Sequence, residues 1–258
     1  MPYLQEIEAR DIQFYFQFSL NDYGSGIEPG LPVVKERIRI FRELSKQIGA
    51  HRIIWRYDPI ILGGSLTVEN TLERLYGIGR EIAAYTEKLV FSFVDWYRKT
   101  ERNLRMLDPT LRPPSEEEMQ QIARGILEVE RALPTRLKLA TCAEVLDLQR
   151  LGIKHNKCID PELLLRLCPD CREFQNFCRK SVPNVNQAIL PGITVKFPLK
   201  SSKDSGQRKA CGCAPGKDIG MYDTCRHFCA YCYANQSEEA VLSRLHRMMP
   251  NYYPDGKP

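Results

Sequence analysis

The sequence predicts an α/β protein with a partial or open β/α barrel-like body over residues 1–198 and a cysteine-rich segment over residues 199–258. Three observations support this prediction. Strand-like runs alternate with amphipathic helical patterns through the first two thirds of the chain. The composition becomes polar and unpatterned after about Pro198. Three cysteines with the spacing C-x-x-x-C-x-x-C then follow near the C-terminus.

The expected strands are residues 14–20, 52–57, 88–95 and 137–141, with a less marked one at 189–197, and the expected helices are 34–48, 68–82, 115–133, one from Asp160-Pro161 and 237–248. Gly49 is predicted to be a left-handed C-terminal cap. Asp58-Pro59 is expected to stop the second strand. Ser115 and Glu118 have the spacing of a capping box, and Asp160-Pro161 supplies a helix cap and a first-turn proline.

Strands separated by helices imply a parallel sheet whose strand C-termini share one rim. The predicted strands are fewer than the eight that close the usual β/α barrel. We therefore expect the barrel to be open or incomplete.

The composition favours a cytoplasmic protein without a membrane span or a signal region. Ten cysteines in a reducing compartment are more often metal ligands or buried side chains than disulfides. The net charge is +5. Basic residues that could bind phosphates or offset thiolate charge crowd the segment before the cysteine run: Lys200, Lys203, Arg208, Lys209 and Lys217. We do not expect nucleic-acid binding, because no recognition motif accompanies them.

The run from Cys225 to Cys232 predicts an iron–sulfur site. Thiolates at Cys225, Cys229 and Cys232 can bind three irons of a 4Fe–4S cluster and leave the fourth open. The alternative is a structural zinc closed by His227, Cys211 or Cys213.

Cys211 and Cys213 are further candidate ligands. They can complete the first cluster, support a second one or remain as thiols that shield it. The sequence does not choose among these three interpretations.

Polar residues at the predicted strand ends form a second candidate set. Arg56 and Asp58 alternate along one strand and so face the same way, with Asp95 after another strand. We take these three as candidate catalytic residues and Gln17 and Asn21 as ligand-binding ones. The alternatives are a structural ion pair, or hydrolase or lyase chemistry with Asp58 or Asp95 as acid or base.

The remaining cysteines have no assigned role. Cys142 and Cys158 follow strand-like segments, so they lie at the rim or serve as packing residues. Cys168 and Cys171 form a C-x-x-C pair open to redox, metal or unconnected roles, and Cys178 follows them.

Several strings carry a family resemblance: Phe14-Tyr15-Phe16-Gln17-Phe18 with Asn21, Ile27-Glu28-Pro29, residues 54–60, residues 92–95, Lys157-Cys158-Ile159-Asp160, Gly206-Gln207-Arg208, Cys211-Gly212-Cys213, residues 218–222 and residues 225–235. With them, the chain resembles a bacterial family catalogued as domain of unknown function 1848. Its C-terminal cysteines are similar to the cluster motif of radical S-adenosylmethionine enzymes.

The resemblance implies a 4Fe–4S cluster whose open iron binds S-adenosylmethionine, with Tyr231 where the motif places an aromatic residue beside the adenine. It also implies an electron donor as a partner. It leaves the substrate, a small molecule or a macromolecule, undefined. The non-enzymatic alternative is a zinc or closed-cluster module that fastens the C-terminal segment.

Two features depart from the family pattern. Members usually begin with further barrel segments, including a Ser-Arg-Arg-Thr-Asp string, so we expect the chain to be truncated at its N-terminus. The segment with Cys168-Pro169-Asp170-Cys171 resembles an insertion. In addition, radical enzymes carry their cysteine motif early, after the first barrel strand, whereas here it follows the strands.

Overall fold

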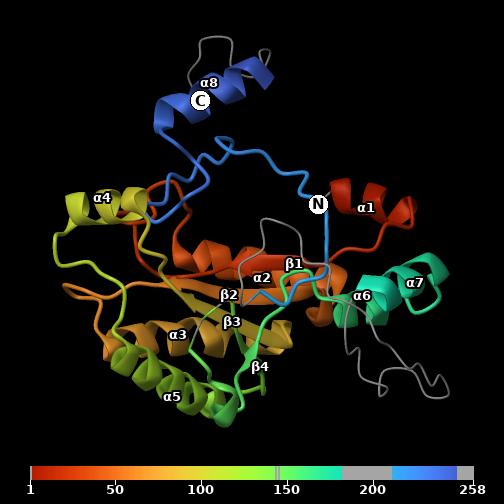
Figure 1. The fold of residues 1–258 in the computed structure, drawn as a ribbon, viewed down its shortest axis with the longest axis horizontal. Coiled ribbons are helices and arrows are strands. Elements are labelled where there is room, and N and C mark those ends of the chain that lie inside the picture. Colours follow the sequence, from red (N-terminus) through yellow and green to blue (C-terminus); the bar gives the residue numbers. More distant parts are fainter. Residues whose placement is uncertain (1, 143, 145, 182–210, 249–258) are drawn as a thin grey trace.

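The computed structural model describes residues 2–142, 144, 146–181 and 211–248 (Figure 1). The strands are β1 Phe16–Ser19, β2 Ile53–Ile60, β3 Lys88–Phe93, β4 Lys138–Thr141 and β5 Lys154–His155. The helices are α1 Pro2–Ala9, α2 Val34–Ile48, α3 Val68–Ile82, α4 Arg98–Leu107, α5 Glu116–Ala132, α6 Pro161–Leu167, α7 Arg172–Ser181 and α8 Glu238–Met248. The predicted mixed α/β class is confirmed.

The strands form a single open sheet in the order β1-β2-β3-β4-β5, and each strand runs parallel to the next. Helices α2, α3 and α5 lie in the connections between successive strands up to β4. In the part of the chain that the structure describes, β1 and β5 are the two edges, so the sheet does not close.

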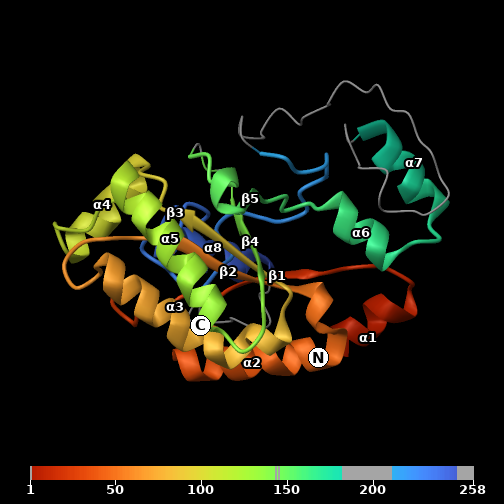
Figure 2. The same ribbon diagram turned by 90° about the horizontal axis from the view of Figure 1, so that it is seen from below.

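The two faces of the sheet differ. Trp55, Phe91 and their alternating neighbours pack with α2, α3 and α5 in the main core. Ile54 and Val90 point to the opposite face, which we call the polar face because Arg56 and Asp58 follow Ile54 on it. Helix α6 packs on part of this face. Figure 2 shows α2 and α3 on one side of the strands and α6 and α7 on the other.

Local sequence signals account for the helix starts. The Thr67 side chain accepts a hydrogen bond from the Asn70 N–H at 3.2 Å before α3. The capping box of Ser115 and Glu118 is present before α5. Asp160 accepts from two backbone N–H groups at the start of α6. The predicted caps of these last two helices are confirmed.

Two local predictions are wrong. Gly49 has φ 92° and ψ 145°, so its positive φ suits glycine, but its ψ is extended rather than left-handed helical. Strand β2 runs through Asp58-Pro59 to Ile60, with a register shift between Tyr57 and Ile60. Pro59 has no N–H to donate to a neighbouring strand, and the register shift accommodates it. The Asp58 N–H donates to the Asn21 side chain at 2.9 Å.

Among the described α-helices and strands, α1, α4, α7 and β5 were not predicted. Helix α4 buries only Thr100 and Leu104, so it offers few apolar residues from which a helix could be predicted. The predicted strand at 189–197 lies outside the described residues, as do Lys200, Lys203, Arg208 and Lys209. Among the described helices, none combines the length and apolar character needed to cross a membrane.

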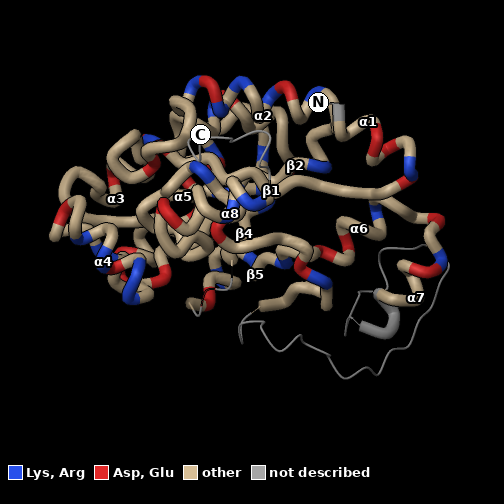
Figure 3. Tube along the Cα trace, turned by 90° about the horizontal axis from the view of Figure 1, so that it is seen from above, with Lys and Arg blue, Asp and Glu red and all other residues tan. Residues whose placement is uncertain are grey.

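The ends of the parallel strands define a common rim, which we call the strand-end rim. The residues that follow the strands there are Leu20, Ile61, Val94, Cys142 and Asn156. The C-terminal segment from residue 211 crosses to this region before α8 (Figure 1). Both signs of charge occur along α2, where Glu36 and Glu43 lie among five Lys and Arg side chains (Figure 3).

Candidate functional site

Residues 225–232, which we call the cysteine loop, form turns rather than a helix. The Cys232 N–H donates to the Cys229 carbonyl at 2.9 Å, and Phe228 has a positive φ of 51°. The Asn235 side chain donates to the Cys225 carbonyl at 2.7 Å. These turns hold the three predicted ligands on one short loop, with Cys225 exposed and the other two half-buried.

The cysteine loop is docked on the segment that follows β1. The Ala230 N–H donates to the Ile27 carbonyl at 2.9 Å, and the Gly30 N–H donates to the His227 carbonyl at 3.0 Å. The His227 ring nitrogen Nδ1 lies 2.9 Å from the Gly30 carbonyl. A Cβ on Gly30 would lie 2.6 Å from His227 Cα, so this close approach requires glycine.

Helix α4 contacts the other side of the cysteine loop. Lys99 Nζ donates to the Cys232 carbonyl at 3.1 Å, and Asn103 Nδ2 donates to the Ala230 carbonyl at 3.4 Å. The loop therefore lies over the strand-end rim between the segments that follow β1 and β3. It occupies this place although it comes after every described strand in the sequence.

Tyr231 holds the cysteine loop in place through both its ring and its hydroxyl. Its ring packs in an apolar cluster with Ile27 and Ile61, and its hydroxyl donates to Glu28 at 2.7 Å. Glu28 also pairs with Arg37 at 3.2 Å, and both side chains are almost completely buried. Burial, followed by the Glu28 charge, raises the pKa of Tyr231, so the phenol remains a neutral donor.

The thiols of the cysteine loop lie close enough to influence one another. Burial, with contributions from Glu28, Cys232 and Cys225, raises the pKa of Cys229 to about 11. Without a bound cation this thiol stays protonated, and a positive metal centre would favour its thiolate.

The donor set fits an iron–sulfur or zinc site in chemistry and spacing. Within the described ranges, however, no three His, Cys, Asp or Glu side chains are already arranged to hold a metal ion. Binding at the cysteine loop therefore requires its thiol side chains to turn toward a common centre.

Arg56 and Asp58 lie at the polar face of the rim, as the strand alternation predicts. Arg56 Nη2 donates to Asp58, and Arg56 Nη1 donates to Gln17 Oε1 at 3.0 Å. The Ser92 hydroxyl donates to the second oxygen of Asp58. Burial opposes the charge of Arg56, but Asp58 and the Cys142 thiol raise its pKa above the ordinary range. The result is a half-buried ion pair with a fixed guanidinium.

Asn21 and Asp95 occupy different environments. Asn21 is buried, and its Nδ2 donates to the Asp58 carbonyl at 3.0 Å and lies 3.4 Å from the Tyr231 hydroxyl. It links the strand end that carries Asp58 to the cysteine loop. Asp95 follows β3 and is exposed. Arg56 and Asp58 are contacted by Gln17, Ser92, Asn21 and Cys158.

A second group of cysteines meets at the other end of the rim. Cys142 Sγ and Cys158 Sγ are 3.4 Å apart, and the Cys158 N–H donates to Cys213 Sγ at 3.0 Å. Cys213 also has a side-chain hydrogen bond with Cys211. We call these four residues the cysteine row. Cys142 and Cys158 are thus thiol neighbours rather than isolated packing residues.

The charges around the row affect its thiols differently. A hydrogen bond with Cys158 lowers the pKa of Cys142, and Arg56 lowers it further against the effect of burial. The same hydrogen bond raises the pKa of Cys158. In this pair Cys158 therefore keeps its proton and acts as the donor, and Cys142 is the acceptor that loses its proton first.

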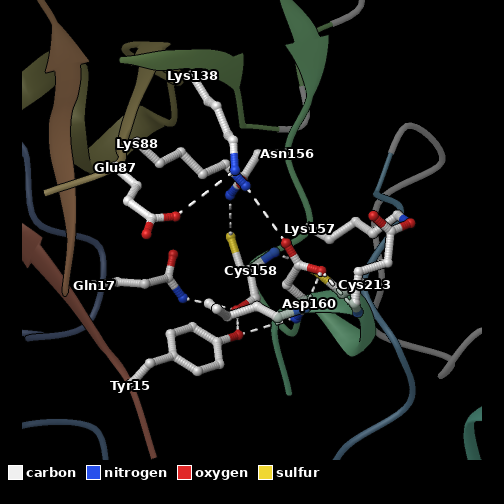
Figure 4. Close-up of polar contacts among 12 residues, drawn as sticks. Tyr15, Gln17, Glu87, Lys88, Lys138, Asn156, Lys157, Cys158, Asp160 and Cys213 are labelled. Atoms are coloured by element: carbon white, nitrogen blue, oxygen red, sulfur yellow. Dashed lines mark hydrogen bonds and ion pairs between the residues drawn. The ribbon is translucent and has the colours of Figure 1, made fainter. Parts of the chain in front are cut away.

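Figure 4 shows the surroundings of Cys158. The Tyr15 hydroxyl and Gln17 Nε2 both donate to the Cys158 carbonyl, the latter at 2.9 Å. Asn156 Nδ2 lies 3.5 Å from Cys158 Sγ. Burial raises the pKa of Tyr15 to about 12. The fold thus fixes the backbone of Cys158 from β1 and its sulfur from the segment after β5.

A cavity of about 1060 Å³ extends along β4 and β5 from the beginnings of the strands, away from the cysteine loop. Four of its cations are paired with carboxylates: Lys88 with Asp160 at 3.6 Å, Lys138 with Glu87 at 3.7 Å, Arg166 with Glu87 at 2.9 Å and Lys157 with Glu162 at 3.0 Å. The first two pairs are visible in Figure 4. The cavity therefore does not present a surface of a single charge.

Cys168 and Cys171 lie at the turn between α6 and α7, where the Cys171 N–H donates to the Cys168 carbonyl at 3.4 Å. Burial, followed by the hydrogen bond with Cys171, raises the pKa of Cys168. The side chain of Cys178 lies outside what the structure describes.

Sequence reasoning missed Ser92, Glu28, Arg37 and the grouping of the cysteine row. Ser92 alternates with Val90 on β3, so the pattern that placed Arg56 and Asp58 could have placed it too. Glu28 and Arg37 lie in a loop and on a helix without a periodic signal for their contact. The meeting of Cys142 with Cys158 depends on the pairing of β4 with the two-residue β5.

A model of one protein family, described as Domain of unknown function (DUF1848), matches residues 1–234. No curated protein and no solved structure matches the chain. The family match covers the sheet, the strand-end rim and the whole cysteine loop.

Proposed function

Because the chain belongs to the family described as Domain of unknown function (DUF1848), and because its fold docks a three-cysteine loop on a polar strand-end rim, we propose that it is an iron–sulfur enzyme of the radical S-adenosylmethionine type. In this proposal Cys225, Cys229 and Cys232 hold a 4Fe–4S cluster. The neighbouring rim binds S-adenosylmethionine and the substrate.

The docking of the cysteine loop is the observation that carries the proposal. Backbone hydrogen bonds from residues 27–30 and side-chain donors from α4 fix the loop over the rim. A chemical site at the carboxyl ends of parallel strands is the usual arrangement in β/α folds. A loop that served only to hold the chain together would not need this position.

A bound 4Fe–4S cluster would supply one electron and one iron position without a protein ligand. The chain's own residues supply the rest. Arg56, held by Asp58 and Gln17, presents a fixed cation that suits a carboxylate. Asn21 connects this group to Tyr231, so that the rim and the loop keep one relative position.

Tyr231 and Asp95 complete the proposed site. The hydroxyl of Tyr231 donates to Glu28, so an adenine would contact its ring rather than its hydroxyl. Asp95 is exposed at the rim and is kept as a candidate acid or base. Both assignments rest on the family resemblance and the position along the strands.

We also propose that the open sheet is a segment of a β/α barrel. Its consecutive parallel order, with connecting helices in one layer, is the arrangement of neighbouring barrel units. The cysteine-rich segment would then form a second unit that covers the barrel mouth. The proposed boundary near residue 198 lies outside the described residues.

The test is an electron spin resonance spectrum of the full chain, purified without oxygen and reduced. We expect a cluster signal that shifts when S-adenosylmethionine is added, since the ligand binds the open iron. Stoichiometric zinc without sulfide would instead support a structural module. A cluster signal indifferent to S-adenosylmethionine would support a closed cluster. Either of these results overturns the radical assignment.

A further inference from the structure

The cysteine row gathers thiols from three separate parts of the chain. Cys142 follows β4, Cys158 follows β5, and Cys211 and Cys213 belong to the segment that leads toward the cysteine loop. All four are half-buried. Nothing in the local sequence requires these segments to converge, so their convergence is a property of the fold.

Nitrogen donors surround the sulfur atoms of the row. Arg56 Nη1 and Asn156 Nδ2 each lie 3.5 Å from Cys158 Sγ, and the Cys158 N–H donates to Cys213 Sγ at 3.0 Å. Hydrogen bonds of this kind stabilise metal-bound thiolates and orient them. The Arg56 guanidinium also offsets part of the net charge of about −2 that four thiolates leave around one divalent ion.

The spacing favours one ion over a cluster. Four sulfurs at about 2.3 Å from a tetrahedral Zn²⁺ lie about 3.8 Å from one another. Cys142 Sγ and Cys158 Sγ are 3.4 Å apart, which is close to that spacing. In an iron–sulfur cubane each thiolate binds its own iron, so its thiolates are spread more widely.

We propose that Cys142, Cys158, Cys211 and Cys213 bind a single Zn²⁺ in tetrahedral four-sulfur coordination, at a site separate from the cysteine loop. The thiols as described form a row and do not yet surround a centre. Closure requires the side chains to turn, with Cys211 moving from the end of the row to the fourth corner. The sites differ in ligands and in metal, so this inference does not depend on the proposed function.

The site would fasten the C-terminal segment to the edge of the sheet. The Ala214 N–H donates to the Ile159 carbonyl at 3.0 Å, and Ala214 is buried. A zinc bound beside this contact would fix the segment where it leaves the sheet toward the cysteine loop. Cys142 and Cys158 precede residue 182, whereas Cys211 and Cys213 follow residue 210. The ion would therefore link the described parts of the chain on either side of residues 182–210.

The test is elemental analysis of the full chain purified without oxygen, with zinc, iron and sulfide measured per chain. We expect about one zinc, which Cys158→Ser and Cys213→Ser lose and which Cys229→Ala and Cys171→Ser keep. Cys229→Ala separates the inference from the proposed function, because it removes a ligand of the cysteine loop only. If Cys158→Ser and Cys213→Ser fail to fold, Cys211→Ser, at the end of the row, replaces them and should also lose the zinc.

Cobalt provides a second measurement. The Co²⁺-loaded wild-type chain should show the intense absorption of thiolate-bound tetrahedral cobalt, and Cys211→Ser should lose most of it. Two results would overturn the proposal. One is a folded wild-type chain without zinc, and the other is a Cys158→Ser variant with undiminished zinc.

Discussion

At the scale of single residues, Glu28 connects the fold to the cysteine loop. Its carboxylate accepts from Tyr231 and pairs with Arg37 in a setting that excludes water almost completely. Two of the three guanidinium nitrogens of Arg37 are buried without a further partner, so the Arg37 charge depends on Glu28. Removal of one member of a buried pair is far more costly than removal of both.

We therefore predict that Glu28→Gln lowers the free energy of unfolding by about 3 kcal/mol, because it leaves the Arg37 charge uncompensated. Urea denaturation measures this change. The matched control is Glu36→Gln, which removes an exposed pairing with Arg39 and should leave the free energy of unfolding almost unchanged. Equal small effects of both variants would show that the buried pair does not stabilise the loop.

Arg56 is the residue whose role is most directly testable by binding. If its guanidinium holds a carboxylate of S-adenosylmethionine, Arg56→Gln should weaken binding by about tenfold or more, the loss of one charge-assisted hydrogen bond. Equilibrium dialysis against the labelled ligand measures the affinity. Arg105→Gln, on the exposed side of α4, should leave it unchanged. If the folded Arg56→Gln variant bound S-adenosylmethionine with unchanged affinity, the ligand-binding role would be contradicted and Arg56 would be only part of a structural ion pair.

Residue types alone predicted the cysteine loop and the pair of Arg56 and Asp58, because metal-ligand spacing and strand alternation are local patterns. Ser92 belonged to the same alternation but was not selected, since serine is common in strands of any kind. Glu28 and the cysteine row depend on contacts between distant segments, and the sequence carries no local signal for those contacts.

At the scale of elements, α5 begins with a capping box whose strength depends on pH. Arg112, together with the Ser115 N–H, holds the pKa of Glu118 at about 2, below its ordinary value of 4.5. A depressed carboxylate pKa stabilises the fold fully above the ordinary value. This stabilisation disappears as the pH falls from about 4.5 toward 2.

We predict that Glu118→Gln lowers the free energy of unfolding by about 0.5–1 kcal/mol at pH 6, the range of a surface cap and ion pair. The difference from wild type should shrink steadily below pH 4.5 and approach zero below pH 2, because the Glu118 carboxyl is then protonated and uncharged like the glutamine. Denaturation curves at a series of pH values check this. A difference independent of pH would mean that the charge of Glu118 contributes nothing.

Two helical glycines provide a second test at this scale. A Cβ on Gly125 of α5 would lie 2.2 Å from Leu72 Cδ1 of α3, whereas a Cβ on Gly77 of α3 would meet nothing within 4 Å. Alanine at either site gains up to about 1 kcal/mol of helix propensity. Only at Gly125 must the packing of two helices shift to admit it.

We predict that Gly77→Ala raises the midpoint of thermal unfolding and that Gly125→Ala lowers it, with a net loss of about 1–2 kcal/mol at Gly125. Circular dichroism melts of the two variants measure the shifts side by side. Stabilisation by both substitutions would show that Leu72 moves aside without cost and that the α3–α5 contact is loose.

Element prediction succeeded where the apolar period was long and the caps were explicit, as in α2, α3 and α5. It failed where tertiary contacts decide the structure. Strand β5 has two residues and exists because it pairs with β4. Strand β2 continues through Asp58-Pro59 because the Asn21 side chain accepts a hydrogen bond from the Asp58 N–H and the register shifts between Tyr57 and Ile60. Neither outcome follows from local propensity.

At the scale of the whole molecule, the order of segments in the sequence differs from their order in space. The cysteine loop comes after β1–β5, yet it lies on the rim beside residues that follow β1 and β3. The pattern of strands and helices predicted the sheet and its rim. That pattern did not predict that the cysteine loop returns to the rim. This position depends on Gly30, on the contact of Tyr231 with Glu28 and on the side-chain donors of α4.

The central claim is that the cysteine loop binds a cluster. Iron and acid-labile sulfide per chain, measured on protein purified without oxygen, test it most directly. The account predicts about four of each in the wild-type chain and in Cys171→Ala, and the loss of most of both in Cys229→Ala, because a missing thiolate leaves too few anchors. Full iron and sulfide in Cys229→Ala, or a folded wild-type chain without either, would contradict it.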